Sequence, residues 1–213
     1  MRKVTREEYL KFMEAHDFVL IEDVKVELVK EWNLTKFQPD SYAPEEWTVW
    51  SFPDRGDWAT HIGNYRGNWS PYIPRNLIDK YTKPGEVVCD PMMGSGTTLV
   101  ECKLLGRDGI GIDVNPNAVM IAMNRLDFRY VPIDPKYKEP SIRIYEGDAR
   151  RLDKIGDQSI DLVATHPPYC GIVPYSKSQI PGDLSALKLE SFLREIGTVA
   201  EECFRILKPD KYC

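Results

Sequence analysis

The stretch that decides the fold is Val-Val-Cys-Asp-Pro-Met-Met-Gly-Ser-Gly-Thr-Thr, residues 87–98. Its β-branched beginning, Val87 and Val88, predicts a short buried strand that ends at Asp90. The two glycines around Ser95 predict a tight turn, and an apolar helical pattern begins directly after it. This order of strand, glycine turn and helix builds nucleotide sites in α/β proteins, because glycine lets the backbone approach a ligand and a helix N-terminus offers free N–H donors.

Strands and helices alternate along the rest of the chain. Apolar runs typical of buried strands lie at 109–113, 141–145 and 159–164, and helical patterns lie at 75–81, 99–105, 116–126 and in a long amphipathic stretch after Asp183 or Ser185. Four strands that alternate with helices predict a doubly wound, mostly parallel α/β sheet. The sequence ends at Cys213, soon after Lys208 and Pro209, so we expect the sheet to stop before a fifth strand and the domain to be incomplete at its C-terminus.

The N-terminal part of the chain is rich in aromatic residues, and all five tryptophans lie between positions 32 and 69. Apolar spacing over residues 3–30 predicts one or two helices, and prolines and glycines break any long helix after them. We therefore divide the chain into an irregular leader, residues 1–60, and a catalytic domain, residues 61–213. Large aromatic side chains are usually buried, so we expect the leader to pack on the flank of the domain. A partner surface or a wall of the ligand pocket is the alternative.

Length and composition indicate one large domain, with 213 residues of which 42% are hydrophobic. No apolar run approaches the ~20 residues needed to span a bilayer, and the charged N-terminus lacks the apolar core of a signal peptide. The five cysteines show no paired metal-ligand spacing, so we expect free thiols and no metal site. These features predict a cytoplasmic protein without membrane contact.

The net charge of −5 is unevenly distributed along the chain. Residues 1–60 hold 8 Lys/Arg and 13 Asp/Glu, whereas residues 61–213 hold 20 of each. Neither part has the basic excess of a protein that binds DNA by itself. If DNA is the substrate, we expect the target-recognition region to be separate from these residues, either after Cys213 or on another chain.

The loop Asp-Pro-Met-Met-Gly-Ser-Gly-Thr-Thr, residues 90–98, resembles the S-adenosylmethionine loop of the DNA amino-methyltransferases, which methylate N4 of cytosine or N6 of adenine. The loop lacks the lysine of a P-loop and the third glycine of the dinucleotide fingerprint. Acids follow at the tips of the next two strands, Asp113 and Asp148. The resemblance covers roughly residues 61–210 and implies a Rossmann-like methyltransferase fold with S-adenosylmethionine as cofactor.

The resemblance also assigns parts of the cofactor to residues. An acid at the tip of the second strand accepts hydrogen bonds from ribose hydroxyls, and the acid at the third strand tip contacts the adenine amino group. A proline-containing segment before the first strand closes over the methionine end. The cofactor residues implied are Asn68, Trp69, Pro71, Ile73, Asp90, Pro91, Met92, Gly94, Ser95, Gly96, Thr97, Thr98, Asp113, Val114, Asp148 and Ala149.

The catalytic candidate is Thr165-His166-Pro167-Pro168-Tyr169, which follows the fourth strand. An exocyclic amine is a poor nucleophile, so the site must orient it toward the methyl group and stabilise the positive charge that forms on nitrogen. A side-chain acceptor at His166 and the backbone carbonyl of Pro167 can accept its two N–H groups. The prolines stiffen this turn, and Tyr169 offers a face on which an extruded base can stack.

His166 departs from the family pattern, which usually has Ser, Asp or Asn at this position. Thr165 before the motif is typical of the cytosine-N4 branch, so we predict a DNA methyltransferase of a restriction–modification or orphan type that favours cytosine N4. Adenine N6 remains the nearest alternative. RNA guanine-N2 and protein-glutamine methyltransferases share an Asn-Pro-Pro-Tyr turn, which His166 disfavours. An alternative of another class is a non-catalytic methyltransferase-fold subunit that binds a partner through the leader.

Two further groups of polar residues lie close to these motifs. Tyr175, Ser176 and Lys177 belong to the loop after the catalytic motif, and we expect a solvated loop there rather than contact with the target strand. Arg150 and Arg151 follow Asp148, and we expect an exposed basic pair rather than a phosphate contact.

Overall fold

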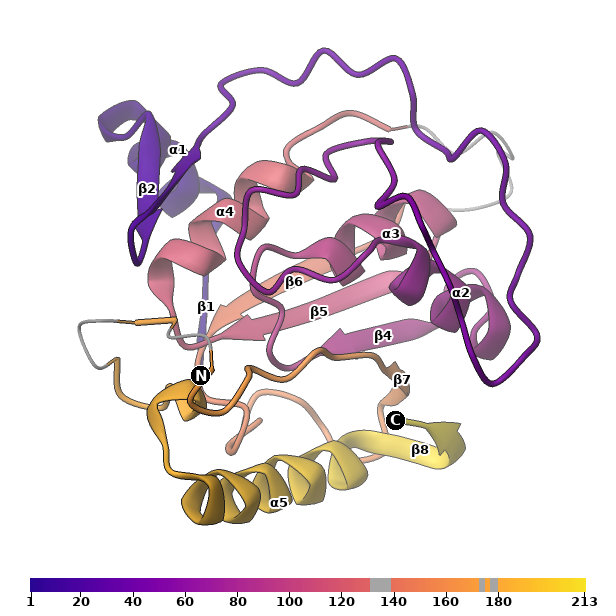
Figure 1. Cartoon of the computed structure of the whole chain (residues 1–213), viewed down its shortest axis with the longest axis vertical. Helices are drawn as coiled ribbons and strands as arrows, with labels where there is room; N and C mark the ends of the chain where they lie inside the picture. The colour runs from indigo at the N-terminus through magenta and orange to yellow at the C-terminus, as the bar shows by residue number, and fades with distance from the viewer. Residues whose placement is uncertain (131–138, 173–174, 177–179) are drawn as a thin grey trace.

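The computed structural model of the chain describes residues 1–130, 139–172, 175–176 and 180–213. Its centre is a six-stranded sheet in the order β1-β6-β5-β4-β7-β8 (Figure 1). The strands are β1 (Arg2–Lys3), β4 (Val87–Asp90), β5 (Asp108–Asp113), β6 (Ile142–Glu146), β7 (Ile160–Val163) and β8 (Leu207–Tyr212). Strand β1 pairs antiparallel with β6 at one edge, and the other neighbouring strands are parallel.

Helices cover both faces of this sheet. Figure 1 shows α3 (Thr97–Leu105) and α4 (Pro116–Leu126) on one face, with α2 (Tyr72–Tyr81) beside them, and α5 (Leu189–Ile206) on the other. Helix α3 begins and ends at Gly96 and Gly106, which have φ values of 82° and 74° that favour glycine. The side chain of Asn115 caps α4. The predicted doubly wound α/β fold is confirmed.

The N-terminal segment is more regular than the sequence predicted. The expected helix is α1 (Arg6–Ala15), which starts with a capping box between Thr5 and Glu8. Of the one or two helices predicted for residues 3–30, α1 is the one that forms, because β2 (Phe18–Ile21) and β3 (Val24–Glu27) make an antiparallel hairpin. The apolar residues in β3 recur every second position, which is the period of a strand and not of a helix.

Two predictions about the C-terminal segment are also corrected. The sheet does not stop before a fifth parallel strand, because β8 pairs in parallel with β7. Strand β8 contains Pro209, and an edge strand tolerates proline because it leaves one side of the strand unpaired. The side chain of Asp183 caps a short 3-10 helix, η1 (Leu184–Ala186), and α5 begins only at Leu189.

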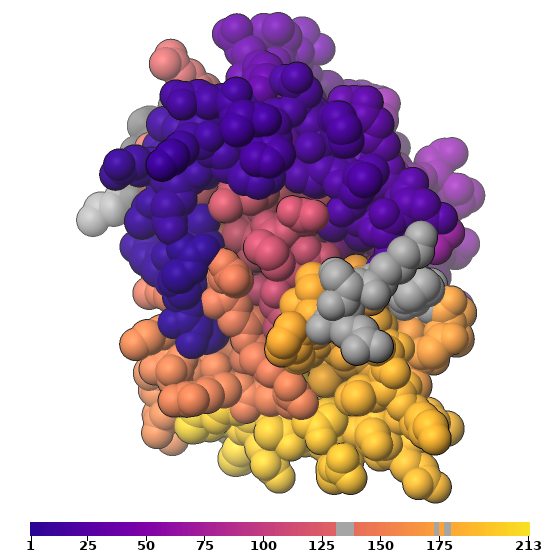
Figure 2. Space-filling view, turned by 90° about the vertical axis from the view of Figure 1, so that its left-hand side faces the viewer, coloured from indigo at the N-terminus to yellow at the C-terminus, as the bar shows by residue number. Residues whose placement is uncertain are grey.

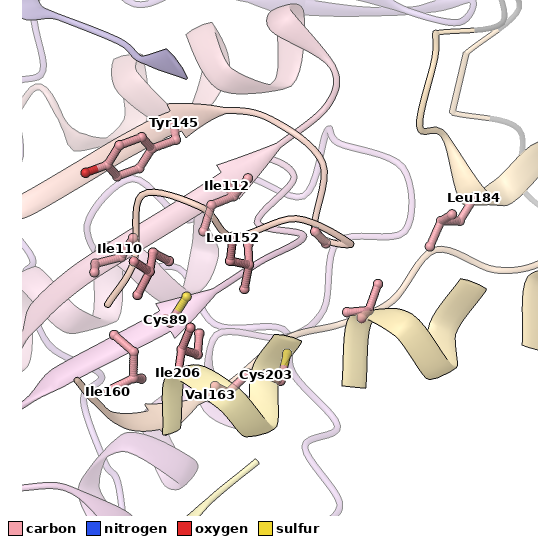
Figure 3. Packing of buried hydrophobic residues seen from close by; sticks show 13 residues of the cluster. Cys89, Ile110, Ile112, Tyr145, Leu152, Ile160, Val163, Leu184, Cys203 and Ile206 are labelled. Carbon is pink, nitrogen blue, oxygen red and sulfur yellow. The ribbon is translucent and has the colours of Figure 1, made fainter. Parts of the chain in front are cut away.

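Helix α5 is fixed to the sheet by a buried apolar cluster (Figure 3). Cys203 and Ile206 of α5 pack in this cluster with Cys89 of β4 and with Ile160 and Val163 of β7. Complete burial of a side chain such as Ile206 stabilises the fold by about 1.5 to 3 kcal/mol. The two strands that precede the predicted motifs are therefore held by one core. All five cysteines are free.

The strand order places the two predicted motifs at the same point of the sheet. From β4 the chain builds β5 and β6 on one side, and it then returns to place β7 on the other side of β4. Ligands of open α/β sheets bind at the carboxyl ends of the strands where the order reverses in this way. Figure 2 faces this edge, with the N-terminal segment in indigo above and the C-terminal part in orange and yellow below. In the described residues, no helix is long and apolar enough to cross a bilayer.

Candidate active site

A pocket with an empty volume of about 850 Å³, part of it open to solvent, lies at this reversal point. The lining residues predicted from the sequence are Asn68, Trp69, Asp90, Pro91, Met92, Gly94, Ser95, Asp113, Val114, Asp148, Ala149, His166 and Pro168. The lining residues that were not predicted are Tyr65, Gly67, Met93, Asn115, Tyr175, Ser176, Ile180, Gly182, Asp183 and Leu184. The pocket therefore brings together the glycine loop, the three acidic strand tips and the start of the catalytic motif.

Asp90, at the end of β4, connects the two motifs by hydrogen bonds. Its Oδ2 accepts from Thr98 Oγ1 at 2.6 Å, and its Oδ1 accepts from Thr165 Oγ1 at 2.8 Å. The backbone N–H of Met92 also donates to Oδ1, at 3.2 Å. Burial raises the pKa of Asp90 to about 6, although these hydrogen bonds oppose the shift. Thr98 and Thr165 thus act on the pocket by holding Asp90 rather than by lining it.

Asp113, at the end of β5, holds the glycine loop against the sheet. Its Oδ2 accepts from the backbone N–H of Gly94 at 2.9 Å, and its Oδ1 accepts from that of Asn115 at 2.8 Å. Burial is the main cause that raises the pKa of Asp113 to about 6. Each oxygen keeps lone-pair capacity for a second donor.

The glycine loop itself is packed on three sides. A Cβ at Gly94 would lie 3.2 Å from the Tyr65 ring, and one at Gly96 would lie 3.0 Å from Ala122 Cβ. Arg125 of α4 donates to Ser95 Oγ at 2.6 Å. The next residue is also held, because Thr97 Oγ1 donates to Asn68 Oδ1 at 2.5 Å. The loop is therefore positioned before any ligand binds.

The partners of His166 determine which ring nitrogen carries the proton. Nδ1 lies 3.1 Å from the carbonyl oxygen of Gly67, which can only accept, so we assign the proton to Nδ1. Nε2 is then an acceptor, and the hydroxyl of Tyr169 lies 2.9 Å from it. The ring of Trp69 stacks on the imidazole, with centroids 5.3 Å apart and planes 1° apart. Burial lowers the pKa of His166, which favours the neutral ring.

Asp148, at the third strand tip, is paired with an arginine. Its oxygens accept from Arg150 Nε at 3.0 and 3.1 Å, and Arg150 NH1 lies 2.6 Å from Glu195 of α5. The prediction of an exposed Arg150 is therefore wrong, because the acids on both sides hold it. Gly182 packs against this end of the pocket, since a Cβ there would lie 2.9 Å from Asp148 Oδ2 and 3.1 Å from Val114 Cγ1.

A family model described as DNA methylase, the N6/N4 methyltransferase model, matches residues 5–124, which is more than half of the chain. This chain belongs to the N6/N4 DNA methylase family. The match confirms the family that the sequence predicted, and with it S-adenosylmethionine as the cofactor.

Three relatives of this chain are type II methyltransferases. M.HpaI from Haemophilus parainfluenzae is 46% identical over 93 residues, which are 40% of this chain and 27% of that protein. M.Cfr9I from Citrobacter freundii is 31% identical over 113 residues, 53% of this chain and 36% of that protein. M.MjaII from Methanocaldococcus jannaschii is 39% identical over 65 residues, 30% of this chain and 12% of that protein. The chain therefore spans about a third or less of the length of these relatives.

Among solved structures, the chain is similar to a SAM-dependent methyltransferase from Methanosarcina mazei. The identity is 21% and the TM-score 0.43, and the similarity covers 62% of this chain and 52% of that one.

Of the other predicted residues, Pro168 lines the pocket, whereas Pro71, Ile73, Pro167 and Tyr169 do not. Pro71 and Ile73 lie at the N-terminal end of α2, and neither is among the described residues that line the pocket. The catalytic motif forms the corner after β7, where Pro168 lines the pocket and Tyr169 is 40% exposed. Pro167 lies between them, and the role of its backbone carbonyl as an acceptor stays a prediction.

The leader, residues 1–60, contains both buried and exposed tryptophans. Trp58 is fully buried against α3, which agrees with a leader packed on the flank, whereas Trp47 is 80% exposed. Trp69 follows the leader in the chain and lines the pocket, so the aromatic-rich stretch contributes this tryptophan to the pocket wall.

Sequence reasoning missed the lining residues that come from segments without a motif. Tyr65 lies at the end of the aromatic-rich stretch, and Asp183 was taken only as a helix cap. Tyr175 and Ser176 line the pocket instead of lying in a solvated loop, and Lys177 lies outside the described residues. One available signal was the cluster of glycine and proline around 181–182, which predicts a close backbone approach.

Proposed function

We propose that this chain is the catalytic part of a DNA methyltransferase that transfers a methyl group from S-adenosylmethionine to an exocyclic amino group, with cytosine N4 favoured over adenine N6. The observation that carries the proposal is the pair of hydrogen bonds at Asp90. The side chain of Asp90 accepts from Thr98, after the glycine loop, and from Thr165, before His166. The same carboxylate therefore positions the segments proposed to hold the cofactor and the target base. The preference for cytosine N4 rests on Thr165 in the family resemblance.

The pocket fits the charge and polarity of the proposed cofactor. Four carboxylates line it, and the lining residues that the structure describes include no lysine or arginine, which suits a ligand with a sulfonium and an ammonium group. Asn68 Nδ2 is buried without a hydrogen-bond partner among the described residues, so it is a free donor for the carboxylate of the methionine end. Asp113 has capacity for the ribose, and Asp148 and Val114 would flank the adenine.

The bound cofactor supplies an electrophilic methyl group, and the protein's part is to hold the amine in line with it. His166 Nε2 accepts one N–H of the target amine, and the carbonyl of Pro167 accepts the other. Both acceptors stabilise the positive charge as it develops on the amine nitrogen. The hydroxyl of Tyr169 now bonds to Nε2, so it must move away when a base enters, and its ring is then free to stack.

The test is methyl transfer from labelled S-adenosylmethionine to DNA by the full-length protein, followed by nucleoside analysis. We expect N4-methylcytosine. His166→Ala and Tyr169→Ala should abolish transfer while S-adenosylhomocysteine still binds, and Tyr169→Phe should keep transfer because it keeps the ring. Tyr212→Phe, at an exposed tyrosine of β8, is the matched control. Full activity of both alanine variants would contradict the assignment, and cofactor binding without transfer to any nucleic acid would favour the non-catalytic subunit.

A further inference from the structure

Asp183 carries a buried oxygen that has no partner in the described part of the protein. It lines the pocket just before η1, in the segment that follows the catalytic motif. Its Oδ1 accepts from the backbone N–H of Ser185 at 2.9 Å and from Ser185 Oγ at 2.6 Å. Its Oδ2 is buried and accepts no hydrogen bond from any described residue. A buried acceptor without a partner destabilises the protein, so a donor from a ligand would stabilise it.

Asp183 shares the pocket with the acids at the second and third strand tips. Gly182 packs on Val114 and Asp148, the end predicted to hold the adenine. Asp113 lines the same pocket. Burial is the main cause of its raised pKa, and the charge of Asp183 adds to it. Two carboxylates in one pocket repel, and a group with two O–H donors that bonds to both would relieve this repulsion.

We propose that Asp183 Oδ2 accepts a hydrogen bond from a ribose hydroxyl of the cofactor, in the pocket that Asp113 also lines. The inference rests on the proposed function, because it assumes an adenosyl ligand in this pocket. The ammonium group of the cofactor is the less suitable donor to Asp183. The methionine end that carries this group is assigned to Asn68 and Trp69, which belong to a different segment, the one before α2. No described lysine or arginine lines the pocket to compete for Oδ2.

The contact would also connect the cofactor to the loop after the catalytic motif. Ser185, which bonds to Asp183, accepts through Oγ from the backbone N–H of Tyr175 at 3.4 Å. Its carbonyl oxygen accepts from the N–H of Gly171, two residues after Tyr169, at 3.0 Å. A ribose held by Asp183 would therefore fix the segment that carries Tyr169.

Asp183→Asn is the sharpest variant. The N–H of Ser185 requires an oxygen at the capping position, so the asparagine must keep Oδ1 there and present an NH₂ group where Oδ2 was. Asp183→Ser keeps a capping hydroxyl and removes Oδ2, which provides a second route to the same result. Asp157→Asn, at an exposed carboxylate far from the pocket, is the matched control. Thermal unfolding of each variant checks that the fold is retained.

The measurement is calorimetric binding of four ligands to the wild type and the variants: S-adenosylhomocysteine, its 2′-deoxy and 3′-deoxy forms, and 5′-methylthioadenosine. We expect Asp183→Asn and Asp183→Ser to weaken S-adenosylhomocysteine and 5′-methylthioadenosine about tenfold. At least one deoxy ligand should be insensitive to both variants.

Unchanged affinity for S-adenosylhomocysteine in both variants would overturn the inference. So would an equal loss with both deoxy ligands, or a loss that disappears with 5′-methylthioadenosine, because the contact would then be to the amino-acid end. A wild-type protein that binds none of the four ligands would refute the proposed function itself, so the two failures can be told apart.

Discussion

Asp90 is the residue on which both halves of the site depend. It stands at the end of β4, next to β7 in the sheet, so a threonine from each motif reaches it. Three donors satisfy its oxygens, yet it is only 2% exposed and its charged form is poorly solvated. The protein keeps a buried acid here at the expense of its own stability, as expected of a group that serves a ligand rather than the fold.

Asp90→Asn should therefore stabilise the unliganded protein at high pH. Burial raises the pKa of Asp90 in the folded state to about 6 from 3.8, so the folded state binds a proton more readily than the unfolded chain. The resulting loss of stability grows as the pH rises from 3.8 to about 6 and is complete above pH 6. Two pKa units correspond to about 3 kcal/mol in the free energy of unfolding at pH 8. The advantage of the variant should fall to about half at pH 5 and disappear below about pH 4.

Urea unfolding of wild type and variant at pH 8, 5 and 4 measures this dependence. The control is Asp157→Asn, whose carboxylate is largely exposed and should shift little at any pH. A variant that is less stable than wild type at pH 8 would show that the three hydrogen bonds outweigh the burial of the charge.

The acids at the strand tips could be predicted because each is local to a motif. Asp90 and Asp113 end apolar runs, Asp148 lies two residues after the end of β6, and a parallel sheet brings the ends of its strands to one edge. Asp183 could not be predicted in this way. It lies 17 residues after His166, and only the folded backbone decides that its second oxygen faces the pocket.

At the scale of elements, α3 is held to the leader by a buried polar cluster around Glu101. Glu101 is fully buried, and its carboxylate accepts from Trp58 and His61 at 2.7 Å each and from Arg75 of α2 at 2.8 Å. Burial lowers the pKa of His61, so the neutral ring donates from Nε2. Glu101 belongs to α3, the helix that begins at the glycine loop, so the cluster connects the leader to the site through this helix.

Glu101→Ala should destabilise the protein strongly, by about 3 to 5 kcal/mol, because it leaves Arg75 buried without its charged partner. Denaturant unfolding measures the change. Glu146→Ala is the matched control, since Glu146 pairs with Arg2 at the surface and should contribute about 1 kcal/mol or less. Equal effects of the two substitutions would mean that water or other groups already satisfy the cluster around Glu101.

The elements that the sequence predicted are those with strong local patterns. The strands at 87–90, 108–113, 142–146 and 160–163 are apolar runs, and the helices 97–105 and 116–126 have clear caps. The elements that were missed lack such signals. Strand β1 has two residues, β8 contains a proline and three charges, and the hairpin β2–β3 is short enough to pass for a helical segment.

At the scale of the whole molecule, the distribution of charge indicates how strongly this chain can bind DNA by itself. The leader has an excess of five acids, the remaining residues are balanced, and the pocket is lined by carboxylates. This distribution suits a cationic cofactor and does not suit a phosphate backbone. Strong DNA binding would then require basic surface from a segment or chain other than residues 1–213.

We therefore expect residues 1–213 to bind a DNA duplex weakly and with little dependence on salt. A protein that neutralises Z phosphates shows a slope of about −0.9Z in log K against log salt, and the balanced charge of residues 61–213 supports only one or two such contacts. Fluorescence anisotropy of a labelled duplex between 50 and 200 mM salt should give a slope no steeper than about −2. A slope near −5 would contradict this, because it would require a basic DNA-binding face that the balanced charge of this chain does not predict.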